Sequence, residues 1–181
     1  MRVKTDLLVG EWAVLALLCE APRHGYEIAT LMAPDGEIGR VWSLRRPMTY
    51  RTITALEGLG LVVVDALEPG TTAPTRRIMR ATDDARDRVT AWLATPEEHV
   101  RDLRSGLLLK LHFLRRGGEQ TAPLLEAQRA VLARQADALT EQREQRDELA
   151  GMLAQWRRSI TEAALQFVDL QLAELSSSRR S

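Results

Sequence analysis

The sequence is poor in cysteine, in aromatic residues and in net charge. Its 181 residues contain one cysteine, so no intrachain disulfide can form, and this favours a reducing compartment. Aromatic residues make up only 4% of the chain, and 25 basic residues are balanced by 25 acidic ones. Because the formal net charge is zero, the overall charge indicates neither a nucleic-acid partner nor a membrane surface. Any basic binding site must therefore be local.

Long apolar runs are also missing. No segment approaches the roughly 18 apolar residues that a membrane span needs. The N-terminal apolar stretch is interrupted by Glu11 and Trp12. The residues before Cys19 are two leucines rather than the small residues of a signal-peptide cleavage site. We therefore expect a cytoplasmic protein that does not bind membranes.

Motifs that carry catalysis or hold metals are not found in the sequence. The three histidines show no metal-binding spacing, and there is no Cys-x-x-Cys, no Gly-x-Ser-x-Gly and no phosphate-binding loop. The pair Gly58 and Gly60 precedes a predicted strand, so it is interpreted as a helix end and not as a dinucleotide-binding loop. The carboxylates are scattered over predicted solvent faces. We expect neither an enzyme nor a metal ion or organic cofactor.

The first half of the chain predicts short helices followed by a hairpin. Apolar residues at helical spacing from Leu8 to Cys19 form a helix that is apolar nearly all round, and such a helix must be buried by its own domain or by a partner. A shorter helix follows over residues 26–32, and Pro47 marks the first turn of a third. Residues 61–67 and 76–81 predict two strands joined by a polar loop. Three helices and a hairpin with a long tip are the order of a winged helix-turn-helix.

The second half predicts long helices. Thr82 is a candidate N-cap for a fourth helix, and Pro96 follows that helix. We therefore expect a winged domain over residues 1–95 and a helical dimerisation domain over residues 96–181, in a mainly α protein with a small β-hairpin. Leucines at heptad spacing and a stripe on the last helix supply the apolar surface for a homodimer. The candidate dimerisation residues are Leu125, Leu132, Leu139, Trp156, Ile160 and Phe167.

Arginines gather in two segments that contain no acid. Residues 40–56 carry four arginines and residues 69–82 carry three. In a winged helix-turn-helix the third helix and the hairpin face the same side, so both would meet DNA. Arg51 and Thr54 lie on the side of the third helix opposite Ile53 and Leu56, which makes them candidate contacts. Arg45 and Arg46 extend the same basic segment. The alternative is that these arginines are merely solvated.

Several short motifs together resemble the PadR family of bacterial transcriptional regulators. They are His24-Gly25-Tyr26-Glu27-Ile28, Trp42-Ser43-Leu44 followed by Tyr50, the segment 55–62 with the sequence ALEGLGLV, and Thr82 before a helix that ends in Trp92-Leu93. The resemblance covers about residues 8–95 in detail and the remainder in plan. The chain departs from the family pattern at Arg45, Pro47, Met79 and Ala85, so the resemblance does not give the operator sequence.

The resemblance implies a homodimer that binds a palindromic promoter site, usually as a repressor, and that is often released by a small aromatic effector. It also implies that Tyr50, with its neighbours Thr49 and Arg51, contacts DNA from the recognition helix, and that Arg76 and Arg77 do so from the wing. His24 and Tyr26 are interpreted as packing residues of the second helix. A rival interpretation is a winged-helix module that binds a protein instead of DNA.

Trp12 is the candidate effector-binding residue. It lies on the first helix, whose apolar surface exceeds what one small domain covers, so one face of that helix is expected to meet the partner subunit or the long helices. An apolar cleft lined by an indole suits a planar aromatic molecule. Solid packing of Trp12 in the dimer core is an equally supported alternative.

Overall fold

The structure is a computed structural model, and it describes residues 7–69, 76–141 and 148–178. The chain divides into two compact units. Unit 1 comprises Met1–Trp92 and Leu108–Phe113, and unit 2 comprises Leu93–Leu107 and Leu114–Ser181. The segment Leu108–Phe113, which the sequence places in the helical second domain, thus packs with the N-terminal unit.

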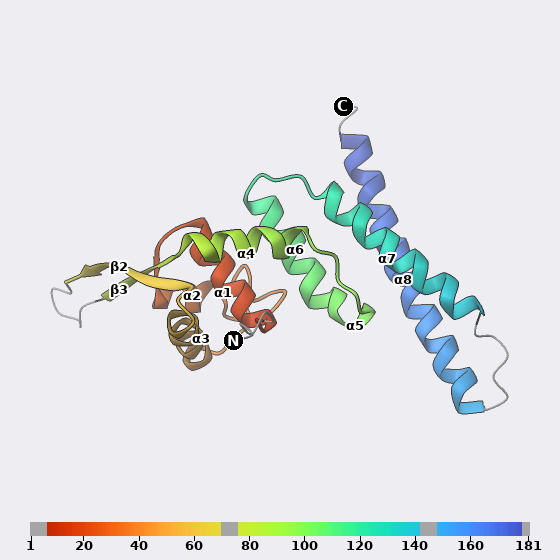
Figure 1. Cartoon of the computed structure of the whole chain (residues 1–181), viewed down its shortest axis with the longest axis horizontal. Coiled ribbons are helices and arrows are strands. Elements are labelled where there is room, and N and C mark those ends of the chain that lie inside the picture. Colours follow the sequence, from red (N-terminus) through yellow and green to blue (C-terminus); the bar gives the residue numbers. More distant parts are fainter. Residues whose placement is uncertain (1–6, 70–75, 142–147, 179–181) are drawn as a thin grey trace. The chain divides into compact units, whose positions relative to one another are not determined.

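Unit 1 contains helices around a small antiparallel sheet (Figure 1). In chain order, its first elements are α1 (Val9–Glu20), β1 (Arg23–His24), α2 (Gly25–Leu31), α3 (Arg46–Gly58), β2 (Val62–Glu68), β3 (Arg76–Ala81) and α4 (Asp83–Ala94), whose last two residues belong to unit 2. The strand order is β1-β3-β2. The predicted hairpin is therefore confirmed as β2 and β3, and the two-residue strand β1, which sequence periodicity did not predict, adds a third strand.

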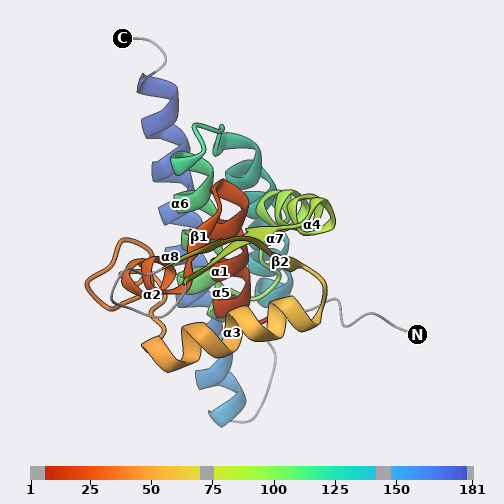
Figure 2. The same cartoon turned by 90° about the vertical axis from the view of Figure 1, so that its left-hand side faces the viewer.

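Helix α1 is the centre of the unit 1 core. Its residues from Ala13 to Leu18 are at most 3% exposed, because α3 and β3 both pack against it (Figure 2). One face of this helix was expected to meet the partner subunit or the long helices, and in the structure residues 13–18 are buried within the chain itself. The chain thus buries this segment without a partner subunit. Leu108–Phe113, which lie beyond the predicted domain end at residue 95, belong to the same unit as this helix.

Helix α3 begins and ends where the sequence indicates. Pro47 occupies its first turn, and Arg45 stands at the N-cap without a side-chain capping bond. At the other end, Gly60 adopts a left-handed φ of 71°, and the Leu61 amide donates to the carbonyl of Leu56 at 3.0 Å. This turn feeds directly into β2, so α3 and the hairpin are held in a fixed relation.

The predicted cap of α4 is confirmed. The Thr82 hydroxyl accepts a bond from the Ala85 amide at 3.4 Å and contacts the Leu61 carbonyl at 3.2 Å, which ties the start of α4 to the beginning of β2. Ala85 and Val89 of this helix are buried.

Unit 2 contains a helix over residues 100–116 and a pair of long helices. The first consists of α5 (Val100–Asp102), a single wider turn η1 (Leu103–Leu107) and α6 (Leu108–Arg116), of which Leu108–Phe113 belong to unit 1. The long helices are α7 (Ala122–Glu141) and α8 (Glu148–Ser178), which run antiparallel side by side (Figure 1). Gly118, which follows α6, adopts a left-handed φ of 70°.

The heptad leucines of α7 do not face a partner. Leu125 and Leu132 are 0% and 1% exposed, so they are buried within the chain, where α7 packs on α8. The assignment of these two side chains to a dimer surface is therefore wrong. The heptad spacing marks an intramolecular helical hairpin, because an antiparallel partner helix in the same chain needs the same apolar seam. Leu139 is half-buried.

Gln128, which lies between these leucines, is completely buried, and both ends of its side-chain amide form hydrogen bonds. Its side-chain oxygen accepts from the Glu97 amide at 2.7 Å, and its side-chain nitrogen donates to the Glu97 carbonyl at 2.9 Å. The polar residue in the seam therefore fixes the segment before α5 onto α7. With these helices, the fold class is confirmed: a winged helix-turn-helix is followed by long C-terminal helices, in a mainly α protein with a small sheet.

Candidate nucleic-acid interface

Helix α3 has one buried and one exposed side. The buried residues recur at helical spacing, and they are Thr49, Thr52, Ile53 and Leu56. The exposed side, which continues from the N-cap, carries Arg45, Arg46, Tyr50, Arg51 and Thr54. Within α3 the only acid is Glu57, in the last turn. The exposed side therefore presents mainly cationic and hydroxyl groups.

Thr49 is not available for an external contact. Its side chain is 0% exposed, and its hydroxyl has no hydrogen-bond partner within the described residues. The prediction that Thr49 contacts DNA is wrong, because a residue adjacent to Tyr50 is rotated by about 100° around the helix and here points into the core. Thr54 is exposed, and its hydroxyl donates to the Tyr50 carbonyl at 3.1 Å.

The three wing arginines differ in their electrostatic partners. Arg77 pairs with Glu57 of α3 at 2.5 Å, and Arg80 pairs with Asp65 across the hairpin at 2.9 Å. Arg76 is exposed and forms no ion pair with any acid in the described parts of the chain, although Glu68 lies opposite it in the strand register. Residues 69–82 contain no acid, so the local sequence did not indicate these pairs. The carboxylates come from Glu57 in α3 and Asp65 in β2.

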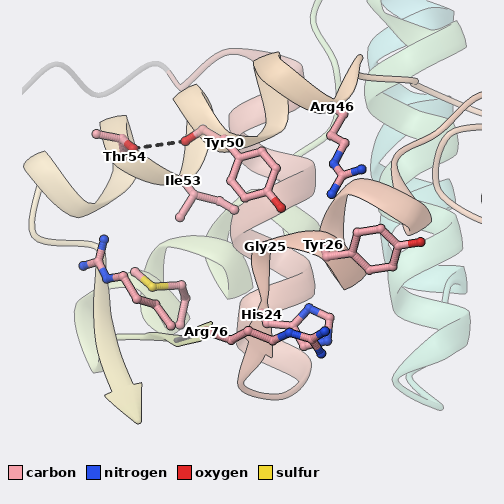
Figure 3. Close-up of a pocket in the computed structure, with 10 residues that line it drawn as sticks. His24, Gly25, Tyr26, Arg46, Tyr50, Ile53, Thr54 and Arg76 are labelled. Carbon is pink, nitrogen blue, oxygen red and sulfur yellow. Dashed lines mark hydrogen bonds between the residues drawn. The ribbon is translucent and has the colours of Figure 1, made fainter. Parts of the chain in front are cut away.

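A groove lies between α3, β3 and the junction of β1 with α2 (Figure 3). It has a volume of about 610 Å³. The buried side chains Ile53 and Met79 contribute apolar surface to its lining. Arg46, Arg76 and Arg77 also line it, together with His24, Gly25, Tyr26, Tyr50 and Thr54. Among the described residues, three arginines and no acid line this groove, so the lining is basic.

The start of α2 contacts the first turns of α3. The guanidinium of Arg46 lies over the ring of Tyr26, with 4.8 Å between its central carbon and the ring centroid. The ring of Tyr50 lies against Gly25 (Figure 3). Tyr26 is 56% exposed, so its interpretation as a packing residue of the second helix is wrong. His24 does serve that helix, because its Nδ1 accepts a bond from the Glu27 amide at 3.0 Å.

Trp12, the candidate effector residue, is part of an aromatic row in unit 1. Its indole is half-buried and stacks on that of Trp92, with ring centroids 5.2 Å apart and planes inclined by 2°. Trp92 also meets the ring of Phe113 edge-on at 6.5 Å, and the ammonium of buried Lys110 lies 5.4 Å from the Trp92 centroid. One indole face of Trp12 is therefore occupied by the chain itself, and its effector role stays a prediction.

Two other findings concern the described residues alone. None of their helices is both long enough and apolar enough to cross a membrane, and no three of their histidine, cysteine and carboxylate side chains gather as metal ligands would.

Burial raises the pKa of the Cys19 thiol to about 11, against a smaller opposing effect of the Arg86 charge.

No family model matches the chain, and no curated protein matches it. The structure of Bacillus subtilis PadR in complex with operator DNA is similar at 17% identity and a TM-score of 0.48, covering 92% of this chain and 99% of that one. A protein from Streptococcus mutans UA159 is similar at 15% identity and a TM-score of 0.43, covering 91% and 98%. A PadR-like transcriptional regulator from Bacillus cereus is similar at 18% identity and a TM-score of 0.40, covering 96% and 99%. Two of these three structures are thus described as PadR or PadR-like, the family that the sequence resembles.

Proposed function

We propose that the chain is a transcriptional regulator that binds double-stranded DNA through α3 and the β2–β3 wing. The observation that carries this proposal is the exposed side of α3, where two arginines at the helix start and one in its middle stand without an acid beside them. An α-helix fits the major groove, and arginine guanidinium groups bind guanine edges and phosphates with paired hydrogen bonds. The exposed wing arginine Arg76 continues the basic surface onto the hairpin.

The proposed contacts divide by position. Arg51 and Thr54, in the middle of α3, are assigned to base edges or to the phosphates beside them, and Tyr50 to the adjacent groove wall. Arg45 and Arg46 at the start of α3, and Arg76 and Arg77 on the wing, are assigned to phosphates. Replacing Arg51 with alanine should therefore relax sequence preference, whereas replacing Arg76 should weaken binding to all sequences alike.

Homodimerisation is proposed to use α8. Six exposed apolar side chains fall on one stripe of this helix, because their spacings of 3, 4, 11 and 14 residues return to the same side. They are Leu149, Met152, Leu153, Trp156, Phe167 and Leu170. The half-buried Ile160 lies on the same stripe. A second copy that covers this stripe would bring two recognition helices to a palindromic site, and occupation of a promoter would make the protein a repressor.

A small aromatic effector is the least direct part of the proposal. Trp12 is partly accessible although one of its faces stacks on Trp92, so a planar ligand would contact the remaining indole surface. Such a ligand would release DNA only if it bound one conformation of the dimer better than another. Titration of planar aromatic compounds, followed by tryptophan fluorescence and DNA release in wild type and in Trp12→Leu, tests this role.

The central experiment is selection of DNA fragments by the purified protein, followed by titration of a selected fragment at several salt concentrations. A DNA-binding regulator should enrich a symmetric sequence, retain it against competitor DNA, and lose affinity by orders of magnitude between low and moderate salt. The rival function, a winged-helix module that binds an acidic protein, predicts no enriched sequence. Failure of enrichment with correctly folded dimer would reject the proposal.

A further inference from the structure

We propose that the turn formed by His24, Gly25 and Tyr26 is a positioning platform, which holds the side chains of Tyr50 and Arg46 in their DNA-binding orientation. The inference rests on the proposed function, since it assigns these positioning residues to the same DNA-binding surface. It differs from the sequence-based assignment, which left this turn to internal packing. Gly25 acts on Tyr50, and Tyr26 acts on Arg46.

Gly25 leaves space that the Tyr50 ring occupies. A Cβ atom at position 25 would lie 2.6 Å from Cε1 of Tyr50, 3.2 Å from Cδ1 and 3.4 Å from Cζ. The first distance is far below van der Waals contact, so any side chain at this position must displace the ring. Tyr50 is 41% exposed, and the ring can therefore swing toward solvent without disturbing the core. The cost of a larger residue at Gly25 thus falls on the position of Tyr50 rather than on the fold.

Tyr26 restricts Arg46 by stacking. Both side chains are exposed, and the 4.8 Å between the Arg46 guanidinium carbon and the ring centroid is a favourable cation–π geometry. A guanidinium held over a ring face keeps its N–H groups, and these remain available to a phosphate. The stack thus fixes a long side chain before DNA arrives, which reduces the entropy lost on binding.

The platform itself is fixed by contacts that do not involve α3. Strand β1 pairs with β3, so that Arg23 lies opposite Met79 and His24 opposite Ile78. His24 also caps α2 through the Glu27 amide at 3.0 Å, and Arg23 forms an ion pair with the Glu27 carboxylate. The turn therefore has its own anchors, and it can impose an orientation on the α3 side chains that rest on it.

The first test uses Gly25→Ala alone and together with Tyr50→Ala. If the added methyl group acts by displacing the ring, Gly25→Ala should weaken binding to a selected DNA fragment about tenfold, the size of one lost specific contact. In the Tyr50→Ala background the same change should have an effect below about twofold, because no ring is left to displace. Gly58→Ala is the matched control, since a Cβ at that position meets nothing within 4 Å. An equal loss in both backgrounds would overturn the role of Gly25.

The second test separates stacking by Tyr26 from direct DNA contact by Tyr26. Tyr26→Leu should weaken binding about two- to fivefold, which corresponds to an exposed cation–π contact, and Tyr26→Phe should retain wild-type affinity because it keeps the ring. Combined with Arg46→Ala, the Tyr26→Leu effect should disappear. A loss with Tyr26→Phe, or a loss that persists without Arg46, would show that Tyr26 contacts DNA itself and would overturn its positioning role.

A measurement without DNA completes the test. The ring current of Tyr26 should shift the Arg46 side-chain protons upfield in the NMR spectrum of the full chain, and the shift should vanish in Tyr26→Leu and remain in Tyr26→Phe. No upfield shift in the wild type would refute the stack directly. The two failures stay distinguishable: a wild type that selects no DNA rejects the proposed function, whereas a wild type that binds DNA with additive double variants rejects the platform alone.

Discussion

The ion pair between Glu57 and Arg77 leads to a prediction that increases DNA affinity. The Glu57 carboxylate lies 2.5 Å from the Arg77 guanidinium. If Arg77 contacts a phosphate, this ion pair must weaken or break. Glu57 also brings a negative charge to the end of the recognition helix, where it would repel the DNA backbone. Glu57→Gln keeps the size of the side chain and removes its charge. We expect this variant to bind DNA more tightly than the wild type.

The magnitude follows from the exposure of the pair. The side chains of Arg77 and Glu57 are 51% and 33% exposed, so their mutual attraction is screened by water, and an exposed pair of this kind contributes about 0.2–1 kcal/mol. Release of that attraction corresponds to a gain of about 1.4- to fivefold in affinity. Each phosphate contact adds about 0.9 to the salt slope, so a fourfold rise in salt should reduce the affinity by about 3.5-fold for each contact. The gain from Glu57→Gln should therefore be largest at low salt.

The assay is fluorescence anisotropy with a selected DNA fragment, measured from about 50 to about 200 mM salt. Asp169→Asn is a matched control, because it also removes one carboxylate from an exposed ion pair, that with Arg129 at 2.6 Å in unit 2. Glu57→Gln should improve binding and the control should not. The reasoning is refuted if Glu57→Gln has no effect, or if its gain persists undiminished when Arg77 is also replaced by alanine.

Three further predictions concern stability, assembly and reactivity. Gln128→Leu should destabilise unit 2 by about 2 kcal/mol in urea unfolding, because two hydrogen bonds to the Glu97 backbone are lost; an unchanged transition would contradict the bonding described above. Trp156→Asp should convert dimers to monomers in light scattering, whereas aspartate at the neighbouring exposed Gln155, off the apolar stripe, should not. With its pKa raised to about 11, the Cys19 thiol stays protonated at pH 8, so it should react slowly with a disulfide reagent in the native protein and quickly in denaturant; equal rates would rule out a protected thiol.

Local sequence signals predicted the elements of the winged fold well. Proline in the first turn and glycine after the last turn marked α3, and Thr82 marked the start of α4. These signals depend on backbone preferences and hydrogen bonds within a few residues, so they can be read without knowledge of the fold. The strand β1 lacked such a signal, because two residues show no periodicity and it forms only through pairing with β3.

Assignments that depended on long-range partners were less successful. The heptad leucines Leu125 and Leu132 predicted an apolar seam correctly, but the sequence did not indicate that α8 of the same chain would fill it. Thr49 was assigned to DNA from its neighbour Tyr50, and its burial was decided by the packing of α3 on α1 and α2. In both cases the pattern identified a face of a helix and left open what covers it.

The sequence by itself determined which segments become helices and strands, and it concentrated arginine in the segments of α3 and the wing. Those properties are fixed by residue type and spacing along the chain. Only the tertiary structure decided which of those arginines is paired, because Glu57 and Asp65 reach Arg77 and Arg80 across 20 and 15 residues of sequence. It alone also placed the Tyr50 ring against Gly25, since contact between two helices depends on how they pack and not on the order of their residues.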